Sequence, residues 1–189
     1  MDANVKGRAV ILAALLVAAC AAPERVAASR AAGVMEEGRA QVDQLAAITL
    51  RDVHPLHGGQ VIYLAADGSG YCQLVSRLPD VVALAEKRYR LAVPADAMAR
   101  LRSLAAAHAA APIASSTSPG LPDASRPRIS VRLASGRSVD VSRWQHDHNA
   151  EFDDLYQALL AVAQTAATQK PLSQGRFEPN WVPDGFQGR

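Results

Sequence analysis

The stretch RISVRLASGRSVDVS, residues 128–142, contains the clearest structural signal in this sequence. Apolar side chains alternate with polar ones on both sides of the pair Ser135-Gly136. A period of two is typical of a strand that buries one face, and a serine-glycine pair is typical of a tight turn. The stretch therefore predicts a β-hairpin whose buried face carries Ile129, Val131, Leu133, Val139 and Val141.

An amphipathic helix is predicted directly after this hairpin. Asn149 is a favourable N-cap, and Glu151, Asp153 and Asp154 suit the positive end of a helix dipole. The apolar positions that follow have the spacing of one helix face, which predicts packing against the sheet. These positions are Phe152, Leu155, Tyr156, Leu159, Leu160 and Ala163.

The same two patterns occur once more, earlier in the chain. Residues 61–64 and 71–75 are β-branched and aromatic runs, and the Asp- and Gly-rich residues 66–70 between them predict a second hairpin. Residues 48–53 and 89–93 alternate as further strands. A helix is then predicted with Pro94 at its first position and an apolar stripe formed by Met98, Leu101, Leu104 and Ala105.

Two segments allow more than one interpretation. A short helix over Glu36 to Ala47 is compatible with the spacing of its apolar residues, and Pro79 to Arg88 has helical spacing over too few turns to decide.

His108 extends the stripe of the helix after Pro94, where a hydrogen-bonded or dipole-facing histidine is expected. Residues 111–127 form a long Pro- and Ser-rich loop.

These elements predict an α+β fold of the two-layer sandwich type. In the order hairpin, helix, hairpin, helix, an antiparallel sheet would carry both amphipathic helices on one face. We assign residues 48–167 to this single domain. Residues 168–189 contain enough Pro and Gly to predict no regular element, so this tail is either loosely ordered or an aromatic strap on the domain or a partner.

The N-terminus has the organisation of an export signal. Lys6 and Arg8 precede eleven residues without a polar group, 9–19, and a bilayer-spanning helix would need about 20. The apolar run ends in Leu16-Val17-Ala18-Ala19-Cys20. We therefore expect a signal peptide over 1–19 and a tether over 20–47.

Those five residues resemble the lipobox of bacterial lipoproteins, in which the cysteine receives the lipid. The resemblance implies a mature chain that starts at lipidated Cys20, and several acyl chains make a stable membrane anchor. Because Ala21 stands where the family's inner-membrane retention signal has aspartate, it implies the outer membrane, with the domain facing the periplasm. The alternative is an ordinary secretory peptide cut near Cys20, which would release a soluble protein. The domain itself is similar to small uncharacterised α+β domains of bacterial lipoproteins.

Four of the five histidines form two clusters, which raises the question of a metal site. His54 and His57 lie in one cluster, and His146 and His148 flank Asp147 in the other. Imidazoles two or three residues apart can bind one zinc ion. The two clusters share a sheet edge only if the strands before them run parallel, and hairpin connections predict opposite edges. Solvated or hydrogen-bonded loop histidines are therefore the expected state, with zinc as the alternative.

Two further features complete the candidate residues. Trp144 lies at a strand-to-helix junction, where it either contributes to a contact surface or is buried with its N–H on a carbonyl. Phe177, Trp181 and Phe186 are spaced along the tail, and exposed aromatics often mark contact surfaces. Cys72 lies in a strand-like run, where a small buried hydrophobe is expected.

Charge and motif content narrow the function classes. The chain has 20 Lys and Arg against 18 Asp and Glu and no polybasic block, which argues against nucleic-acid binding. No local motif places a nucleophile beside a base, so we expect no enzyme. The sequence predicts an envelope lipoprotein that binds another protein, with no cofactor besides its lipid. The alternatives are a metal-binding exported protein and an inhibitor or immunity-type lipoprotein.

Overall fold

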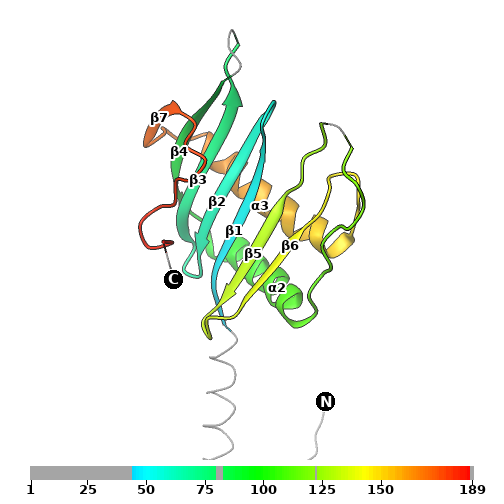
Figure 1. Ribbon diagram of the computed structural model, residues 1–189. Coiled ribbons are helices and arrows are strands. Elements are labelled where there is room, and N and C mark those ends of the chain that lie inside the picture. The colour runs from blue at the N-terminus through cyan, green and yellow to red at the C-terminus, as the bar shows by residue number, and fades with distance from the viewer. Residues whose placement is uncertain (1–43, 80–82, 122, 188–189) are drawn as a thin grey trace, which may run out of the picture. The chain divides into compact units, whose positions relative to one another are not determined.

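The computed structural model describes residues 44–79, 83–121 and 123–187, and these residues form an α+β fold. A seven-stranded antiparallel sheet has the strand order β6-β5-β1-β2-β3-β4-β7. Two helices lie behind the sheet as it is drawn in Figure 1, and the C-terminal segment crosses in front of it. The elements with their bounds are β1 (Leu45–His54), β2 (Gly58–Ala65), β3 (Ser69–Arg77), β4 (Leu84–Ala92), α2 (Ala95–Ala110), β5 (Arg128–Leu133), β6 (Ser138–Ser142), α3 (Ala150–Ala167) and β7 (Ser173–Arg176).

The core lies between the helices and the sheet. Ile48 and Leu50 of β1 and Ile62 and Leu64 of β2 are fully buried in it, because alternate side chains of a strand point to the same face. The predicted stripe of α3 is confirmed. Its residues Phe152, Leu155, Leu159 and Ala163 are buried in the core, and Tyr156 and Leu160 pack against its margin.

The helix starts differ in how they are capped. The side chain of Asn149 accepts the backbone N–H of Phe152 at 3.0 Å, so the predicted N-cap of α3 is confirmed. Pro94 is the N-cap of α2 and makes no side-chain hydrogen bond, which places it one position before the helix rather than at its first residue. Both predicted hairpin turns are present, with positive φ angles at Gly68 and Gly136.

The structure decides the two ambiguous segments as strand where it describes them. Residues 45–47 belong to β1, so the possible helix over 36–47 is wrong for the part that the structure describes. Residues 84–88, in the segment 79–88 that the sequence left undecided, belong to β4, which pairs with β3 over its whole length. In both segments cross-strand pairing in the sheet outweighs a short helical pattern.

The predicted element order is correct only in part. The first four strands form one continuous meander, and β5 and β6 then add to the other side of β1. The expectation of an irregular C-terminal tail is wrong over residues 173–176, which form β7 against β4. The sheet therefore extends beyond residues 48–167 at both ends.

Candidate functional site: the second face of the sheet and its strap

The face of the sheet that points away from the helices, here called the second face, carries polar and aromatic side chains. Tyr63 and Tyr71 are cross-strand neighbours on it, and so are Gln73 and Arg88. On the other side of β2, Arg51 of β1 stands directly opposite Arg128 of β5. An antiparallel sheet can leave such a face to solvent, so whatever covers part of it requires an explanation.

Residues 177–187, here called the strap, cover the part of the second face over β2, β3 and β4. The hydroxyl of Tyr63 donates to the carbonyl of Trp181 at 2.9 Å. The Trp181 ring meets Tyr63 and Tyr71 edge-on, with centroid distances of 5.9 and 6.0 Å, and Phe186 lies 5.6 Å from Tyr63. Edge-to-face pairs at such distances are favourable beyond the area that they bury. The strap therefore forms a small aromatic cluster with the sheet.

Residues on the second face are as buried as the core. Val61 and Gln73 are 1% exposed and Glu86 is 4% exposed, although all three point away from the helices. Tyr63 and Val75 are also buried. The strap thus gives the sheet a second, polar layer of buried side chains.

A charged network fixes the start of the strap. The Glu86 carboxylate accepts from the Gln73 amide, from the Arg88 guanidinium and from the backbone N–H of Glu178, the last at 2.9 Å. Arg88 also donates to the Glu178 carboxylate at 2.6 Å and lies 4.3 Å above the centre of the Trp181 ring. A buried carboxylate is tolerable only when it is paired and hydrogen-bonded. Glu86 meets that requirement partly through the strap.

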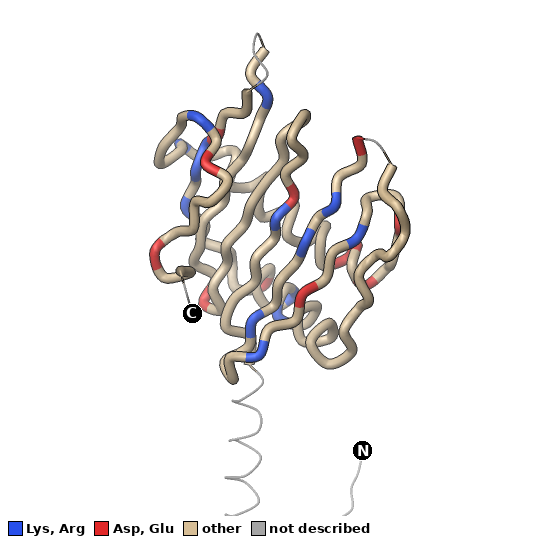
Figure 2. The backbone as a smooth tube through the Cα atoms, in the orientation of Figure 1, with Lys and Arg blue, Asp and Glu red and all other residues tan. Residues whose placement is uncertain are grey.

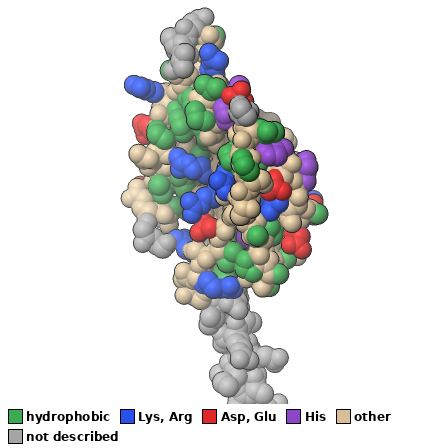
Figure 3. Space-filling model, turned by 45° about the vertical axis from the view of Figure 1, so that its right-hand side comes forward, with side chains coloured by type: hydrophobic (Ala, Val, Ile, Leu, Met, Phe, Trp, Pro, Cys, Tyr) green, Lys and Arg blue, Asp and Glu red, His purple; other side chains and the backbone are tan. Residues whose placement is uncertain are grey.

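The second face is exposed where β5 and β6 continue it. Arg51 donates to the carbonyl of Pro179, and its side chain lies at the boundary between the covered and the exposed part. Arg128 is 61% exposed and pairs at 3.2 Å with Asp140, which is 44% exposed and also accepts from Ser130. Figure 2 shows basic positions of β1 and β5 side by side in the middle of the sheet. Basic side chains also gather at the middle of the turned view in Figure 3.

A cleft lies between the end of the strap and the sheet. Its volume is about 420 Å³, and small residues including Ala47, Ala65 and Gly70 line it. Tyr71, Phe186, Asp184, Arg90 and Arg132 line it as well. Backbone hydrogen bonds hold neighbouring strands about 4.8 Å apart whatever their side chains. The strands therefore cannot move together where β1, β2 and β3 carry small side chains, and a hollow remains above the sheet. The exposed arginines and this cleft form one candidate contact surface.

Trp144 belongs to a separate cluster beyond β6. Its Nε1–H donates to the carbonyl of Ser118 at 2.9 Å, and the Arg126 guanidinium lies 5.0 Å from its ring centre. A Cβ on Gly120 would collide with the Trp144 ring, so only glycine fits there. The second interpretation of Trp144, a buried ring with its N–H on a carbonyl, holds for the hydrogen bond, whereas the ring is half-buried.

The loop of residues 111–127 is held against that junction by Asp147. Its carboxylate accepts from the Ser116 hydroxyl and from the Arg143 guanidinium, the latter at 2.7 Å. The Ser116 hydroxyl in turn accepts the backbone N–H of Trp144 at 3.0 Å. The hydrogen bond from Ser116 and the nearby Arg143 lower the pKa of Asp147. Because Ser116 is buried and used in this way, it is a structural residue rather than a nucleophile.

The four predicted contact aromatics do not form one surface. Phe177, Trp181 and Phe186 belong to the strap, and the backbone N–H of Phe177 donates to the carbonyl of Leu84 on β4. The ring contacts of Trp144, with Arg126 and His146, share no residue with those of Trp181. Of the two fates considered for the tail, the strap packed on the domain is the one observed.

The histidine clusters lie at the same end of the sheet, contrary to expectation. β5 runs antiparallel to both β1 and β6, so β1 and β6 run in one direction. His54 is the last residue of β1, and His146 follows the equivalent end of β6. One whole strand separates the two ends. His54 and His57 stack with ring centres 4.7 Å apart, whereas His148 faces Asp153 at 3.3 Å. Within the described residues no three His, Cys, Asp or Glu side chains form a group that could hold a metal ion.

The remaining titratable groups of the core have structural roles. Cys72 is fully buried, and burial raises the pKa of its thiol to about 12, which suits the small hydrophobe that was predicted. Tyr156 donates to the Asp52 carboxylate. The pKa of Tyr156 is raised mainly by burial and also by this hydrogen bond. Burial lowers the pKa of His108, whose Nδ1 accepts the backbone N–H of Ile113 at 3.4 Å.

The residues that sequence reasoning missed are those beneath the strap. Gln73 lies in a predicted strand, whereas Glu86 and Arg88 lie in the segment 79–88, whose structure the sequence left undecided. The signal that could have found them is the set of aromatics in a Pro-rich tail, which needs an apolar or cationic surface to pack on. Comparison with known proteins adds no further guide, because no protein-family model, no curated protein and no solved structure matches this chain.

Proposed function

We propose that this chain is an exported lipoprotein, anchored in the outer membrane through lipid on Cys20, and that its domain binds another envelope protein without catalysing a reaction. The lipobox at residues 16–20 supports the anchor. Cys20 lies outside the described residues, and no helix within those residues is long and apolar enough to cross a membrane. Covalent lipid would therefore carry the attachment.

The observation that carries the binding proposal is the arginine pair Arg51 and Arg128 on the second face. The two residues stand directly opposite each other on neighbouring strands, and like charges so placed oppose stability. Arg51 donates to the carbonyl of Pro179 on the strap side, whereas Arg128 pairs with Asp140 on the β6 side. Neighbouring exposed arginines on a sheet face are expected where a function uses them.

The chemistry of this surface suits an acidic protein surface. Arginine is enriched in protein interfaces because its guanidinium forms bidentate hydrogen bonds with carboxylates. Thr49 and Ser130, cross-strand neighbours on the same face, add hydroxyl groups between the arginine pair and the cleft. The strap itself is already packed and offers a rigid aromatic border. An inhibitor or immunity-type lipoprotein would use the same surface, and only the identity of its partner would differ.

The anchor is tested by intact mass and membrane fractionation of the wild type and Cys20→Ser in a bacterial host. We expect a lipid-sized mass increment and membrane retention in the wild type, both lost in the variant. An unlipidated wild-type chain in the soluble fraction would exclude the lipoprotein.

The binding surface is tested by placing a photo-crosslinking amino acid at Ser130, with a matched chain that carries it at Gln157. Gln157 is exposed on α3, on the opposite side of the sheet from Ser130. We expect a discrete crosslinked species from position 130 in intact cells and none from position 157. Equal patterns from both positions would contradict the proposal.

A further inference from the structure

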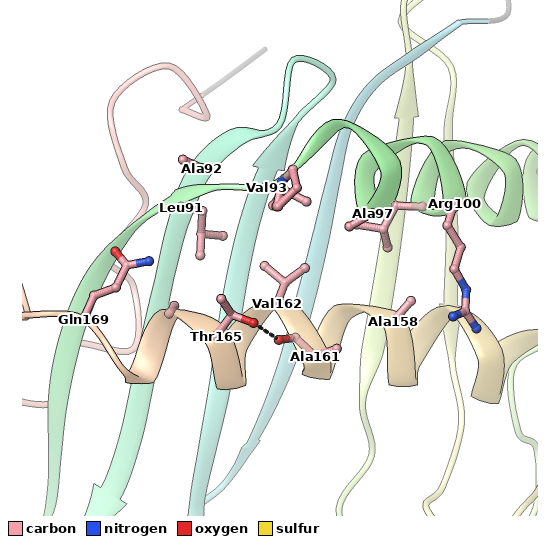
Figure 4. Close-up of a pocket in the computed structure, with 13 residues that line it drawn as sticks. Leu91, Ala92, Val93, Ala97, Arg100, Ala158, Ala161, Val162, Thr165 and Gln169 are labelled. Atoms are coloured by element: carbon pink, nitrogen blue, oxygen red, sulfur yellow. Dashed lines mark hydrogen bonds between the residues drawn. The ribbon is translucent and has the colours of Figure 1, made fainter.

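A second site lies on the other layer of the fold, between the two helices. A groove of about 230 Å³ runs between α2 and α3 beside the end of β4. Its walls are aliphatic, with Leu91, Val93 and Val162 among them. Figure 4 shows these side chains together with Ala97 of α2 and Ala158 and Ala161 of α3 around the space between the helices.

Small side chains are the reason that the groove exists. Ala97, Ala158 and Ala161 occupy positions at which larger residues would fill the gap between α2 and α3. The helices do not close over it, because each is already packed on the sheet through its own buried stripe, which includes Met98 on α2 and Leu159 on α3. Apolar walls open to water favour an apolar occupant.

The two ends of the groove differ in charge. Arg100 lies at one end and reaches from α2 toward α3, and Gln169 lies at the other end, past α3 (Figure 4). Among the residues that the structure describes, Arg100 has no ion pair and no hydrogen-bond partner. No acidic side chain lines the groove. An apolar channel with one unpaired cation at its mouth is complementary to an aliphatic chain that ends in an anion.

We propose that the groove between α2 and α3 binds an aliphatic carboxylate, with the alkyl chain between the helices and the carboxylate on Arg100. The volume sets the scale of the ligand. A cavity of about 150 Å³ accepts benzene, so a groove half as large again accepts a medium-length chain. A free fatty acid and an acyl group with a neighbouring anion share this chemistry.

Titration calorimetry with decanoate tests this site on the purified full chain carrying Cys20→Ser in detergent-free buffer. The substitution removes covalent acyl chains that would compete. Octanoate should bind more weakly than decanoate, by about fourfold for each methylene lost from the groove, the equivalent of about 0.8 kcal/mol. Decyltrimethylammonium, with the same chain and the opposite charge, should bind at least tenfold more weakly than decanoate.

Two variants test separately the apolar walls of the groove and the positive charge at its end. Ala161→Leu should weaken decanoate binding at least tenfold by filling the groove, and its matched control is Ala106→Leu at an exposed position of α2 outside it. Arg100→Gln should weaken decanoate about tenfold and leave decyltrimethylammonium unchanged, with Arg77→Gln as the charge control. Circular dichroism establishes that each variant is folded.

Three results would overturn the proposal. They are no measurable heat with decanoate at either of two temperatures 15 °C apart, equal affinity for the anionic and the cationic decyl compound, and full affinity in folded Ala161→Leu. If binding survives Arg100→Gln unchanged while Ala161→Leu abolishes it, the site accepts aliphatic chains in general and the carboxylate assignment is wrong. Addition of decanoic or phosphatidic acid in vesicles, compared with free decanoate, distinguishes a membrane source from a free acid.

Discussion

The two faces of the sheet are covered by different means. The helix face is closed by α2 and α3 through a continuous apolar core, in which Ile48, Ile62 and Leu159 are fully buried. Over β2, β3 and β4 the second face is covered by the eleven residues of the strap through hydrogen bonds, aromatic contacts and a charged network. Apolar burial is non-directional and tolerates small shifts, whereas the polar layer depends on particular partners. The second face is therefore the more easily disrupted and the more specific of the two.

The contacts also differ in their distance along the chain. Tyr63 and Trp181 are separated by 118 positions, and Arg51 and Pro179 by 128. Within the meander, by contrast, each strand pairs with its immediate successor. The second face is complete only when the last residues of the chain return to the first strands.

Deletion of residues 177–189, which removes the cover of the second face, should lower the stability of the domain more than any single substitution in either layer. The truncated chain would expose Val61 and Tyr63 and would leave the Glu86 carboxylate without the N–H of Glu178. We expect the free energy of unfolding to fall by on the order of 5 kcal/mol, measured by urea denaturation. A chain shortened only by residues 188–189 is the control. Unchanged stability after the longer deletion would show that the strap is not part of the folded domain.

Substitution of Glu86 isolates the charged network. Glu86→Ala leaves Arg88 with only Glu178 as its carboxylate partner, and we expect a loss of about 2 kcal/mol. Glu178→Ala, at a side chain that is 66% exposed, should cost less than about 1 kcal/mol. The double variant Glu86→Leu/Arg88→Met should recover only part of the loss, because it leaves no unpaired charge but still removes the acceptor of the Gln73 amide and of the Glu178 N–H. If Glu86→Ala is neutral, the network does not fix the strap.

Asn149→Ala gives the matching test on the helix side. It removes the acceptor of the Phe152 N–H at the start of α3, and we expect a loss of about 1 kcal/mol. Asn149→Ser, which restores an acceptor, should regain most of it. A loss as large as that from the strap deletion would mean that α3, rather than the strap, limits the stability of the domain.

His108 makes the helix layer sensitive to acid. Burial lowers the pKa of its imidazole below the ordinary 6.5, so the unfolded chain binds a proton more readily than the folded one. Stability should therefore be full above pH 6.5 and fall as the pH drops through the folded-state pKa. Nearby Glu151 opposes the shift. Urea unfolding between pH 8 and pH 5 should show a smaller decline in the free energy of unfolding for His108→Gln than for the wild type. If the free energies of the two proteins fall in parallel with pH, His108 is not the cause of the acid sensitivity.

The helix face was predictable because its information is local. The alternation in residues 128–142 and the stripe after Asn149 each specify an element and its buried side within one short window. The pairing of β5 with β1 was not predictable in this way, because the sequence of neither strand specifies which strand lies beside it. The opposite-edge expectation for His54 and His146 failed for that reason.

The second face was predictable only in outline. Trp181 and Phe186 indicated a packing tail, but their partners Tyr63 and Tyr71 lie more than a hundred residues away and read as core strand residues. Glu86 and Arg88 lie in a segment that the sequence left undecided. In the structure Glu86 is buried and Arg88 half-buried under a segment expected to be irregular. Long-range polar contacts leave no periodic pattern, so the candidate site emerged from the structure.

The most direct test of the second face as a binding surface is the crosslink from position 130 in the wild type and in Arg51→Glu/Arg128→Glu. Both arginines are exposed residues, so the double variant should stay folded, and we expect a loss of about 1 kcal/mol from the Arg51 hydrogen bond to Pro179 and the Arg128 pair with Asp140. The account predicts one discrete crosslinked protein that is lost on charge reversal in a membrane-retained, folded chain. A crosslink that persists at full yield in the double variant, or that never forms in the wild type, would contradict the arginine pair as a docking site.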